Sequence, residues 1–307
     1  MEDHEEEEQP SSFLATKRYA VVTGANRGIG FEICRQLASK GVIVVLTARD
    51  ERKGLEAIER LKDDIGISGD ILFFHRLDVM DPSSISSLAD FVESQFGRLD
   101  ILVNNAGIGG ITVNTEALRS STTREGVEIN WKDYMSQTYE MAIKCLETNY
   151  YGVKRTIEAL IPFLHLSNSP RIVNVSSTAG KLQFVSNEWA IGILGDEENL
   201  SEERVDEVLR EFLRDFEADL LEAKGWPSYL SAYTLSKAAM NAYTRIMAKR
   251  HPNNFMINSV CPGYVKTNSY AGLLTVQEGA VSPVTLALSS EEGHSGLFFS
   301  RKHISSF

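Results

Sequence analysis

The sequence has few of the features that mark secreted, metal-binding or membrane-spanning proteins. Only three cysteines occur in 307 residues, without a C-x-x-C pair, which argues against a disulfide framework and against a zinc site. No apolar run reaches the ~18 residues that span a bilayer, and the N-terminus lacks the basic-then-apolar order of a signal peptide. We therefore predict a cytoplasmic protein with no bound metal and no membrane segment.

Basic residues are also fewer than acidic residues. The chain carries 31 Lys and Arg against 42 Asp and Glu, so it lacks the basic surface that nucleic acids and anionic membranes attract. A small-molecule partner is expected instead. The acidic opening MEDHEEEEQPSS has almost nothing to bury, and residues 1–16 are predicted to form a disordered tail ahead of a single domain over 17–307.

Short apolar segments alternate with longer amphipathic ones along the rest of the chain. Seven of them have the near-continuous apolar content that strands covered on both faces require: YAVVTG, VIVVLTAR, ILFFHRLDV, DILVNNAG, RIVNVSS, INSVCPG and GLFFS. The helical segments between them supply crossovers between parallel strands. The pattern predicts an α/β fold, a Rossmann-type doubly wound parallel sheet of seven strands in a single domain with a helical insertion.

Two connections, about 110–140 and 181–230, are too long for bare loops and are expected to flank a substrate pocket. Six apolar residues of the second connection recur at three- and four-residue steps: Val205, Val208, Leu209, Phe212, Phe216 and Leu220. They predict an amphipathic helix with Ser201 as its N-cap, ended by Gly225 and Pro227. Its apolar stripe must cover either the flank of the main domain or a partner chain.

A glycine-rich turn joins the first predicted strand to a helix in TGANRGIGFEICRQLA. Gly24, Gly28 and Gly30 permit a tight turn and a close approach of the backbone. The free N–H groups of the helix N-terminus then favour an anionic pyrophosphate. A turn with a purely structural role is the alternative, but the flanking strand and helix favour a dinucleotide site.

The end of the second predicted strand indicates which dinucleotide is bound. The segment LTARDERKG places Arg49, Arg52 and Lys53 there, and Arg27 lies in the glycine turn. Cations at this place suit the 2′-phosphate of NADP, whereas NAD sites offer a carboxylate to the ribose. We expect NADPH/NADP+. Solvated surface cations are the alternative for these side chains, and Asp50 keeps NAD as the second choice.

Two Tyr–Lys pairs have the four-residue spacing that places both side chains on one helix face: Tyr150 with Lys154, and Tyr233 with Lys237. A cation beside a tyrosine favours the phenolate and makes the phenol a better proton donor to a carbonyl. A carbonyl also needs a second hydrogen-bond donor. Ser177, at the end of a predicted strand, precedes the second pair, so we take that pair as catalytic and Tyr150 as a packing residue.

Asn149 adds an amide that could hold a water and return protons to the lysine, with an ordinary buried polar residue as the alternative. The motifs T-G-x-x-x-G-x-G, LDV, NNAG, VNVSS, Y-x-x-x-K and CPG follow one another between residues 18 and about 300. In this order they resemble the short-chain dehydrogenase/reductase family. The resemblance implies Asn149, Ser177, Tyr233 and Lys237 as catalytic residues.

The same resemblance, together with the glycine turn and the cations, gives the expected cofactor-binding residues. They are Gly24, Asn26, Arg27, Gly28, Ile29, Gly30, Arg49, Lys53, Asp78, Val79, Asn105, Ala106, Gly107, Tyr233, Lys237, Pro262, Gly263, Val265 and Thr267. The family implies Asp78 beside the adenine and Asn105 beside the ribose. The segment that includes Val265 and Thr267 is expected to border the nicotinamide carboxamide.

The interval from Ser177 to Tyr233 is 56 residues, far longer than in most members of the family. The insertion resembles monomeric carbonyl reductases, and SNEWAIGILGDEENLSEERVDEV and GWPSY are similar to a plant branch of menthone:neomenthol, isopiperitenone and salutaridine reductases. We expect a monomer that reduces a cyclic, apolar, terpenoid-like ketone such as menthone to a secondary alcohol, reversibly. A polycyclic alkaloid ketone, an enone double bond, or NADPH binding without catalysis are the alternatives.

Overall fold

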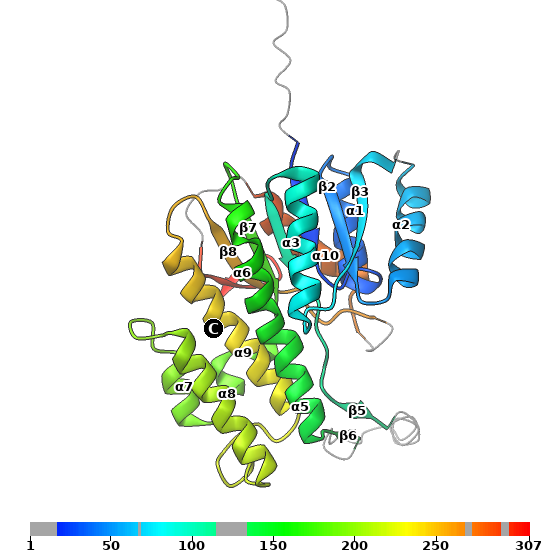
Figure 1. Cartoon of the computed structure of the whole chain (residues 1–307). Helices are drawn as coiled ribbons and strands as arrows, with labels where there is room; N and C mark the ends of the chain where they lie inside the picture. Colours follow the sequence, from blue (N-terminus) through cyan, green and yellow to red (C-terminus); the bar gives the residue numbers. More distant parts are fainter. Residues whose placement is uncertain (1–16, 67–68, 115–133, 268–271, 290–294) are drawn as a thin grey trace, which may run out of the picture.

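A computed structural model describes residues 17–66, 69–114, 134–267, 272–289 and 295–307. The predicted tail, residues 1–16, and the centre of the first insertion, 115–133, lie outside the described residues. Strands and helices alternate through most of the chain, as the apolar pattern predicts (Figure 1). Within the described ranges, none of the helices combines the length and the apolar character that a membrane span requires.

The main sheet has the strand order β10-β9-β8-β7-β4-β1-β2-β3. Its strands are β1 (Tyr19–Val22), β2 (Ile43–Ala48), β3 (Leu72–Arg76), β4 (Ile101–Asn104), β7 (Arg171–Val175), β8 (Met256–Cys261), β9 (Phe298–Ser300) and β10 (His303–Ser305). The first seven pair only in parallel with one another, which confirms the predicted parallel sheet. Chain order reverses between β1 and β4, the switch point where doubly wound sheets bind ligands.

The prediction of seven strands was one too few. β10 pairs antiparallel with β9 at the edge of the sheet, so the sheet is mixed and has eight strands. The turn between them is made at Arg301, with φ of 56°. The usual sequence signal of a tight hairpin is Asn-Gly or Asp-Gly in the turn, and this turn has neither. A three-residue strand after an arginine turn carries no apolar alternation long enough to predict it.

Helices cover both faces of the sheet. One face holds α1 (Gly28–Ala38), α2 (Glu51–Ile65) and α10 (Val276–Leu288), and the other holds α3 (Pro82–Phe96), α6 (Gly152–Leu164) and α9 (Ser231–Arg250). Strand residues alternate between the two cores: Val21 belongs to the α9 side and its neighbour Val22 to the α1 side. Burial on both faces explains why the strands are apolar throughout.

The two long connections form their own elements. The first contains a two-stranded sheet of β5 (Thr112–Val113) and β6 (Met135–Ser136), followed by α5 (Tyr139–Leu146). The second contains α7 (Glu188–Leu194) and α8 (Glu202–Glu217). Ser201 caps α8, as predicted, by accepting a hydrogen bond from the Arg204 N–H.

The predicted end of α8 was wrong. The helix ends at Glu217, and Asp219 turns the chain with φ of 56°, so Leu220 is not a member of the apolar stripe. The Leu220 N–H donates to the Asp215 carbonyl at 2.8 Å and so closes the helix around the left-handed Asp219, ahead of Gly225. The chain then folds back, and the Trp226 indole N–H donates to Asp215 Oδ2 on α8 at 2.8 Å.

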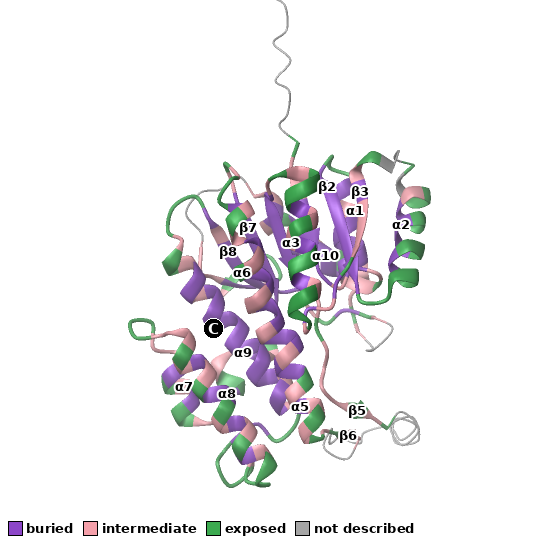
Figure 2. Ribbon diagram, viewed as in Figure 1, coloured by how far each residue is buried: buried purple, intermediate pink, exposed green. Residues whose placement is uncertain are grey.

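The apolar stripe of α8 covers the protein's own domain. Val205, Val208, Leu209 and Phe212 are fully buried in the same core as α9, and α8 lies against α5, α7 and α9. Figure 2 shows the result: α9 is buried along most of its length, whereas α2 at the opposite end of the sheet exposes its outer face. Of the two possibilities for the stripe, the domain flank is the one observed.

Candidate active site

The glycine turn after β1 is held by its neighbour strand. Asn105, directly after β4, donates its side-chain amide to the carbonyls of Thr23 and Gly24 at 2.9 and 3.1 Å. Gly24 has φ of 63°, and a Cβ there would lie 2.8 Å from the Ala106 Cα. A Cβ on Gly30 would lie 2.3 Å from the Asn105 amide nitrogen. Asn105, predicted beside the ribose, therefore also builds the turn.

The N-terminus of α1 has no capping side chain among the residues that the structure describes. Its N-cap, Arg27, makes no side-chain capping bond, and the first turn contains no acidic residue. Gly28 has φ of 62°, and among the described residues an added Cβ would approach Thr267 Cγ2 alone, at 3.9 Å. A helix N-terminus without a capping side chain can offer its N–H groups and its dipole to a pyrophosphate. Asn26 and Ile29 flank this turn and are half-buried.

The cations near the end of β2 are not equivalent. Arg52 pairs with Glu56 at 2.5 Å, and Lys53 lies 3.4 Å from Asp50. Among the residues that the structure describes, Arg27 and Arg49 have no such carboxylate partner, and both are exposed.

Asp50 is the N-cap of α2. The backbone N–H of Lys53 donates to its carboxylate, and this hydrogen bond is the main reason why the pKa of Asp50 lies below its ordinary value. A carboxylate occupied in this way suits a helix cap better than a ribose ligand, so the pattern at this strand end favours a 2′-phosphate.

The loop after β3 places Asp78 at the same edge of the sheet. Asp78 is half-buried and accepts a hydrogen bond from the Met80 N–H. Val79 is buried against α6, where a Cβ on Gly152 would come within 2.8 Å of its Cγ2. The Val79 side chain therefore packs against α6. A ligand could contact this residue through its backbone.

Tyr233 and Lys237 lie in the first two turns of α9 and share a face. The Lys237 Nζ is 5.8 Å from the centre of the Tyr233 ring. Lys237 is 4% exposed, and its ammonium donates to the Val175 carbonyl at the end of β7 at 2.8 Å. Burial lowers the pKa of Lys237 to about 8, while the thiols of Cys145 and Cys261 act in the opposite direction.

Ser177 is brought to the same turn of α9. It caps a single turn of 3-10 helix, Thr178–Gly180, whose last residue presses on Lys237: a Cβ on Gly180 would lie 2.6 Å from the Lys237 backbone. The Asn241 amide also donates to the Gly180 carbonyl, at 3.2 Å. The serine and the Tyr–Lys pair, distant in sequence, are therefore locked together through Gly180.

Asn149 lies within a π-helical segment, Glu147–Tyr151, between α5 and α6. Its Oδ1 accepts from the Ile108 N–H, and its Nδ2 donates to the Ile108 carbonyl and to the Ser236 hydroxyl at 2.9 and 3.0 Å. A Cβ on Gly107 would lie 3.3 Å from that Oδ1 and 3.6 Å from the Lys237 Nζ. Asn149, Gly107 and Lys237 thus meet at one point.

Sequence reasoning missed the π-turn and Ser236. A π-turn has no composition signal, although such turns are frequent at functional sites. Ser236 is an ordinary small residue in a helix until the fold places it opposite Asn149.

The segment after β8 completes the site. Gly263 has φ of 93°, and the Leu274 side chain and the stem of Arg301 pack where its Cβ would be. Val265 forms a β-bridge with Leu274. Thr267 lies near Gly28, because its Cγ2 is the atom 3.9 Å from the position of an added Gly28 Cβ. The run that begins at Pro262 therefore extends from the end of β8 to the glycine turn before α1, and its expected place beside the nicotinamide carboxamide stays a prediction.

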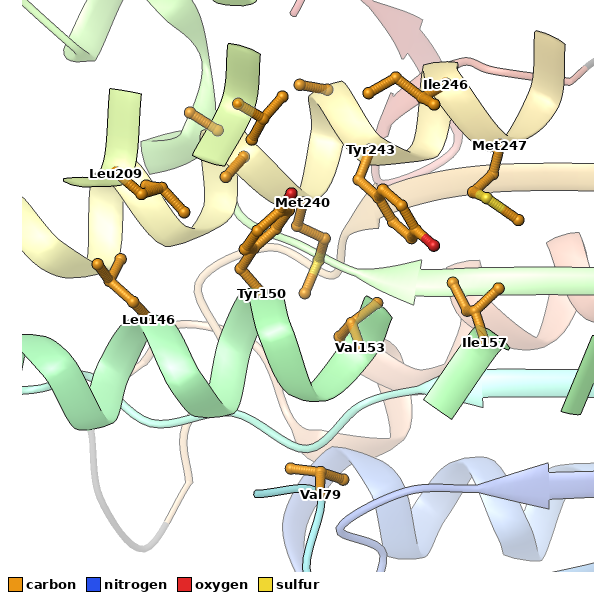
Figure 3. Close-up of a cluster of buried hydrophobic side chains, with 14 of the residues drawn as sticks. Val79, Leu146, Tyr150, Val153, Ile157, Leu209, Met240, Tyr243, Ile246 and Met247 are labelled. Atoms are coloured by element: carbon orange, nitrogen blue, oxygen red, sulfur yellow. The ribbon is translucent and has the colours of Figure 1, made fainter. Parts of the chain in front are cut away.

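The other Tyr–Lys pair is not part of this site. Tyr150 is fully buried and points into the core between Leu146, Val153 and Met240 (Figure 3). Lys154 forms an ion pair with Glu202 of α8 at 2.6 Å. The interpretation of Tyr150 as a packing residue is confirmed.

An uncapped helix N-terminus at a glycine turn, a doubly wound sheet and a Tyr–Lys pair brought close to a serine are the features expected of a nicotinamide-dependent oxidoreductase. Residues 18–188 match the family model described as short chain dehydrogenase, and residues 219–284 match one described as enoyl-(acyl carrier protein) reductase. The chain belongs to the short-chain dehydrogenase/reductase family, and it is an oxidoreductase.

Several relatives belong to the plant group that the insertion resembles. The chain is 59% identical to (+)-neomenthol dehydrogenase of Arabidopsis thaliana, over 95% of this chain and 99% of that protein. The structure of salutaridine reductase from Papaver somniferum is 50% identical with a TM-score of 0.86, covering 92% of this chain and 99% of the other. Menthone neomenthol reductase from Mentha piperita is 50% identical with a TM-score of 0.83, covering 94% and 100%.

Proposed function

We propose that this protein uses NADPH to reduce a cyclic, apolar, terpenoid-like ketone such as menthone to a secondary alcohol, reversibly. The observation that carries the proposal is the Ser177–Tyr233–Lys237 cluster at the mouth of a dinucleotide fold. Ser177 is locked to α9 by Gly180, and Lys237 holds a buried ammonium 5.8 Å from the Tyr233 ring. These are the two hydrogen-bond donors and the cation that carbonyl reduction needs.

The residues present fit the cofactor. The uncapped N-terminus of α1, with no acidic residue in its first turn, suits its pyrophosphate, and Arg27 and Arg49 are the cations best able to meet a 2′-phosphate. The sheet edge formed by the carboxyl ends of the strands also carries Asp78, Asn105 and the segment Pro262–Thr267. When bound, the reduced nicotinamide supplies the hydride.

The protein's own residues handle the oxygen and its proton. Ser177 donates a hydrogen bond to the carbonyl oxygen, and Tyr233 transfers its phenolic proton to that oxygen as the alcohol forms. Lys237 keeps positive charge beside the phenol, which favours the phenolate left behind. Asn149 then contributes a water-mediated return of the proton to Lys237. In alcohol oxidation each transfer runs backward.

Two features support an apolar ketone. Tyr264 and Leu273, beside the Gly263 turn, expose 57% and 88% of their surface, so large apolar side chains are available at the rim. The relatives named above are a neomenthol dehydrogenase and a menthone neomenthol reductase. A polycyclic alkaloid ketone is the second candidate, because salutaridine reductase is as similar in structure. Enone reduction and NADPH binding without catalysis follow, since Tyr233 is retained for carbonyl chemistry.

The substrate is tested by NADPH consumption with menthone, a polycyclic alkaloid ketone, a cyclic enone and a quinone at equal concentrations. We expect the highest kcat/KM with menthone and a secondary alcohol as the product. Preference for the polycyclic ketone would replace the first candidate by the second. Tight NADPH binding without turnover on the whole panel would contradict carbonyl reduction.

The cofactor is tested separately. Arg49→Gln should lower the preference for NADPH over NADH about tenfold, the order expected for one charged contact to phosphate. Arg52→Gln is the matched control, because Arg52 is already paired with Glu56. Equal effects of both substitutions would show that Arg49 makes no phosphate contact.

We also infer a monomer in the cytoplasm. Coverage of α9 and α5 by α8 supports the first point, since that flank is occupied by the chain itself. The three cysteines, all free and buried, are compatible with a reducing compartment. A stable dimer or tetramer in light scattering would contradict the monomer.

A further inference from the structure

Ser236 lies between the catalytic tyrosine and Asn149 but belongs to neither of the predicted sets of residues. It is fully buried, in the turn of α9 that joins Tyr233 to Lys237. Its hydroxyl donates to the Tyr233 backbone carbonyl at 2.7 Å. The same oxygen accepts from the Asn149 Nδ2 at 3.0 Å.

The direction of these hydrogen bonds is fixed. A serine hydroxyl has one proton, and this one is donated to Tyr233, so its oxygen is left as an acceptor for Asn149. The second Nδ2 hydrogen of Asn149 goes to the Ile108 carbonyl, and its Oδ1 accepts from the Ile108 N–H. Exchange of the amide oxygen and nitrogen would place a second donor against the Ile108 N–H. Ser236 thus helps to set which way the amide points.

The orientation of Asn149 matters because its Oδ1 faces the point where Gly107 and the Lys237 Nζ converge. Without the Ser236 hydroxyl, Nδ2 would lose one acceptor, and only Ile108 and the Cys145 thiol, 3.4 Å away, would remain to hold it. The amide could then turn within its pocket. Asn149 would lose its fixed position relative to Lys237.

We propose that Ser236 is a positioning residue: it ties the backbone of Tyr233 to the side chain of Asn149 and so holds the amide in register with Lys237. The role rests on the proposed function, because its catalytic consequence requires carbonyl reduction through Tyr233. Its structural consequence, the fixed hydrogen bond from the Ile108 N–H to Asn149, does not depend on any substrate.

The test compares Ser236→Ala with Thr156→Ala. Thr156 is a matched control because it is also fully buried and also donates to a helix carbonyl, that of Gly152 at 2.7 Å, but lies in α6 away from the cluster. Hydrogen exchange of the Ile108 amide is measured first. We expect exchange about tenfold faster in Ser236→Ala and unchanged in Thr156→Ala, since only the first variant releases Asn149.

Turnover is measured next. Ser236→Ala should lower kcat about tenfold and leave the Kd for NADPH within about twofold, and Ser236→Thr, which keeps a hydroxyl, should restore most of the loss. In an Asn149→Ala background, Ser236→Ala should cost less than about twofold, because the two residues act as one unit. An equal loss in both backgrounds, or equal effects of Ser236→Ala and Thr156→Ala on Ile108 exchange, would overturn the proposal.

The two proposals fail separately. If the wild-type protein reduces no ketone, the proposed function falls, and Ile108 exchange alone decides whether Ser236 holds Asn149. If the wild-type protein reduces ketones but Ser236→Ala changes neither exchange nor kcat, the positioning role falls and the proposed function stands.

Discussion

The molecule contains two tyrosine–lysine pairs with identical spacing in two different helices, and their surroundings make them opposites. Tyr150 and Lys154 stand at the junction of the π-turn with α6, facing α8, while Tyr233 and Lys237 stand at the start of α9, facing the sheet edge. Tyr150 is fully buried, whereas Tyr233 is half-buried and so has a side open to a ligand. The four-residue spacing places both side chains on one helix face. The tertiary structure determines which groups that face contacts.

The two lysines show the difference most clearly. Burial alone lowers the pKa of Lys154, but its hydrogen bond to Glu202 and the charges of Asp206 and Glu202 outweigh burial and raise it. Lys237 is buried without a carboxylate partner, and burial lowers its pKa to about 8. One lysine is neutralised by acids and ties the insertion to the domain. The other keeps an uncompensated charge, which is what a phenol needs beside it.

The largest effect should come from removing the hydroxyl of Tyr233, the tyrosine of the proposed catalytic pair. Tyr233→Phe is expected to lower kcat by about 10³-fold, within the range for loss of a general acid, because no other phenol faces the cluster formed with Ser177 among the described residues. The Kd for NADPH should stay within about twofold. Steady-state kinetics and NADPH fluorescence check both values. Near-normal turnover would contradict the assignment of Tyr233.

A pH profile should separate the two lysines. Since a lysine loses its charge as the pH rises through its pKa, the ammonium of Lys237 is present below about pH 8 and lost above it in the free enzyme. We expect kcat/KM for reduction to fall about tenfold between pH 7 and pH 9. Lys154→Met should show the same profile, because Lys154 keeps its charge throughout this range. A profile that stays flat to pH 10 would exclude Lys237 as the titrating group.

Much of this contrast could be predicted from the sequence. The glycine turn, the strand ends and the Ser177–Tyr233 order favour the second pair as the catalytic one, which stays a prediction. The seven parallel strands followed from their apolar content and are confirmed. Local patterns suffice there because each strand and its turn are specified by neighbouring residues.

What could not be predicted depends on tertiary contacts. The edge strand β10 is short and follows a turn at Arg301 without turn chemistry. The helix α8 ends at a left-handed turn of Asp219 rather than at Gly225, and an aspartate is a weaker stop signal than a glycine. The partners of Lys154 lie about fifty residues away, on an insertion whose docking no periodicity predicts. Ser236 acquires its role only when α9 meets the π-turn.

Removing the charge of Lys154, the lysine of the structural pair, should lower the free energy of unfolding and leave kcat nearly unchanged. Lys154→Met keeps the aliphatic stem but leaves Glu202 with Arg250 alone and Asp206 without its cation. Because Lys154 is 19% exposed, solvent screens part of the charge, and we expect a loss of about 1 to 2 kcal/mol in the free energy of unfolding. Denaturant unfolding measures it. A kcat reduced more than about twofold at a temperature where the variant is folded would contradict a structural role.

The smallest effect should come from the structural tyrosine, and it sharpens the comparison most, because Tyr150→Phe is the same chemical change as Tyr233→Phe. Within the described structure, the Tyr150 hydroxyl is buried and makes no hydrogen bond of normal geometry. Burial, with the charge of Asp206 next, raises its pKa far above the ordinary value, so the phenol neither ionises nor donates to solvent.

Removing such a group costs little, since a buried hydroxyl whose contact with Asp206 is poorly aligned has already lost its hydrogen bonds to water. We expect the free energy of unfolding of Tyr150→Phe to stay within about 1 kcal/mol of wild type, on the stabilising side, and kcat to be unchanged. The aromatic contact with Tyr243, 6.1 Å between ring centres, is kept by phenylalanine. A loss of turnover comparable to that of Tyr233→Phe would mean that spacing, and not surroundings, decides which pair is catalytic.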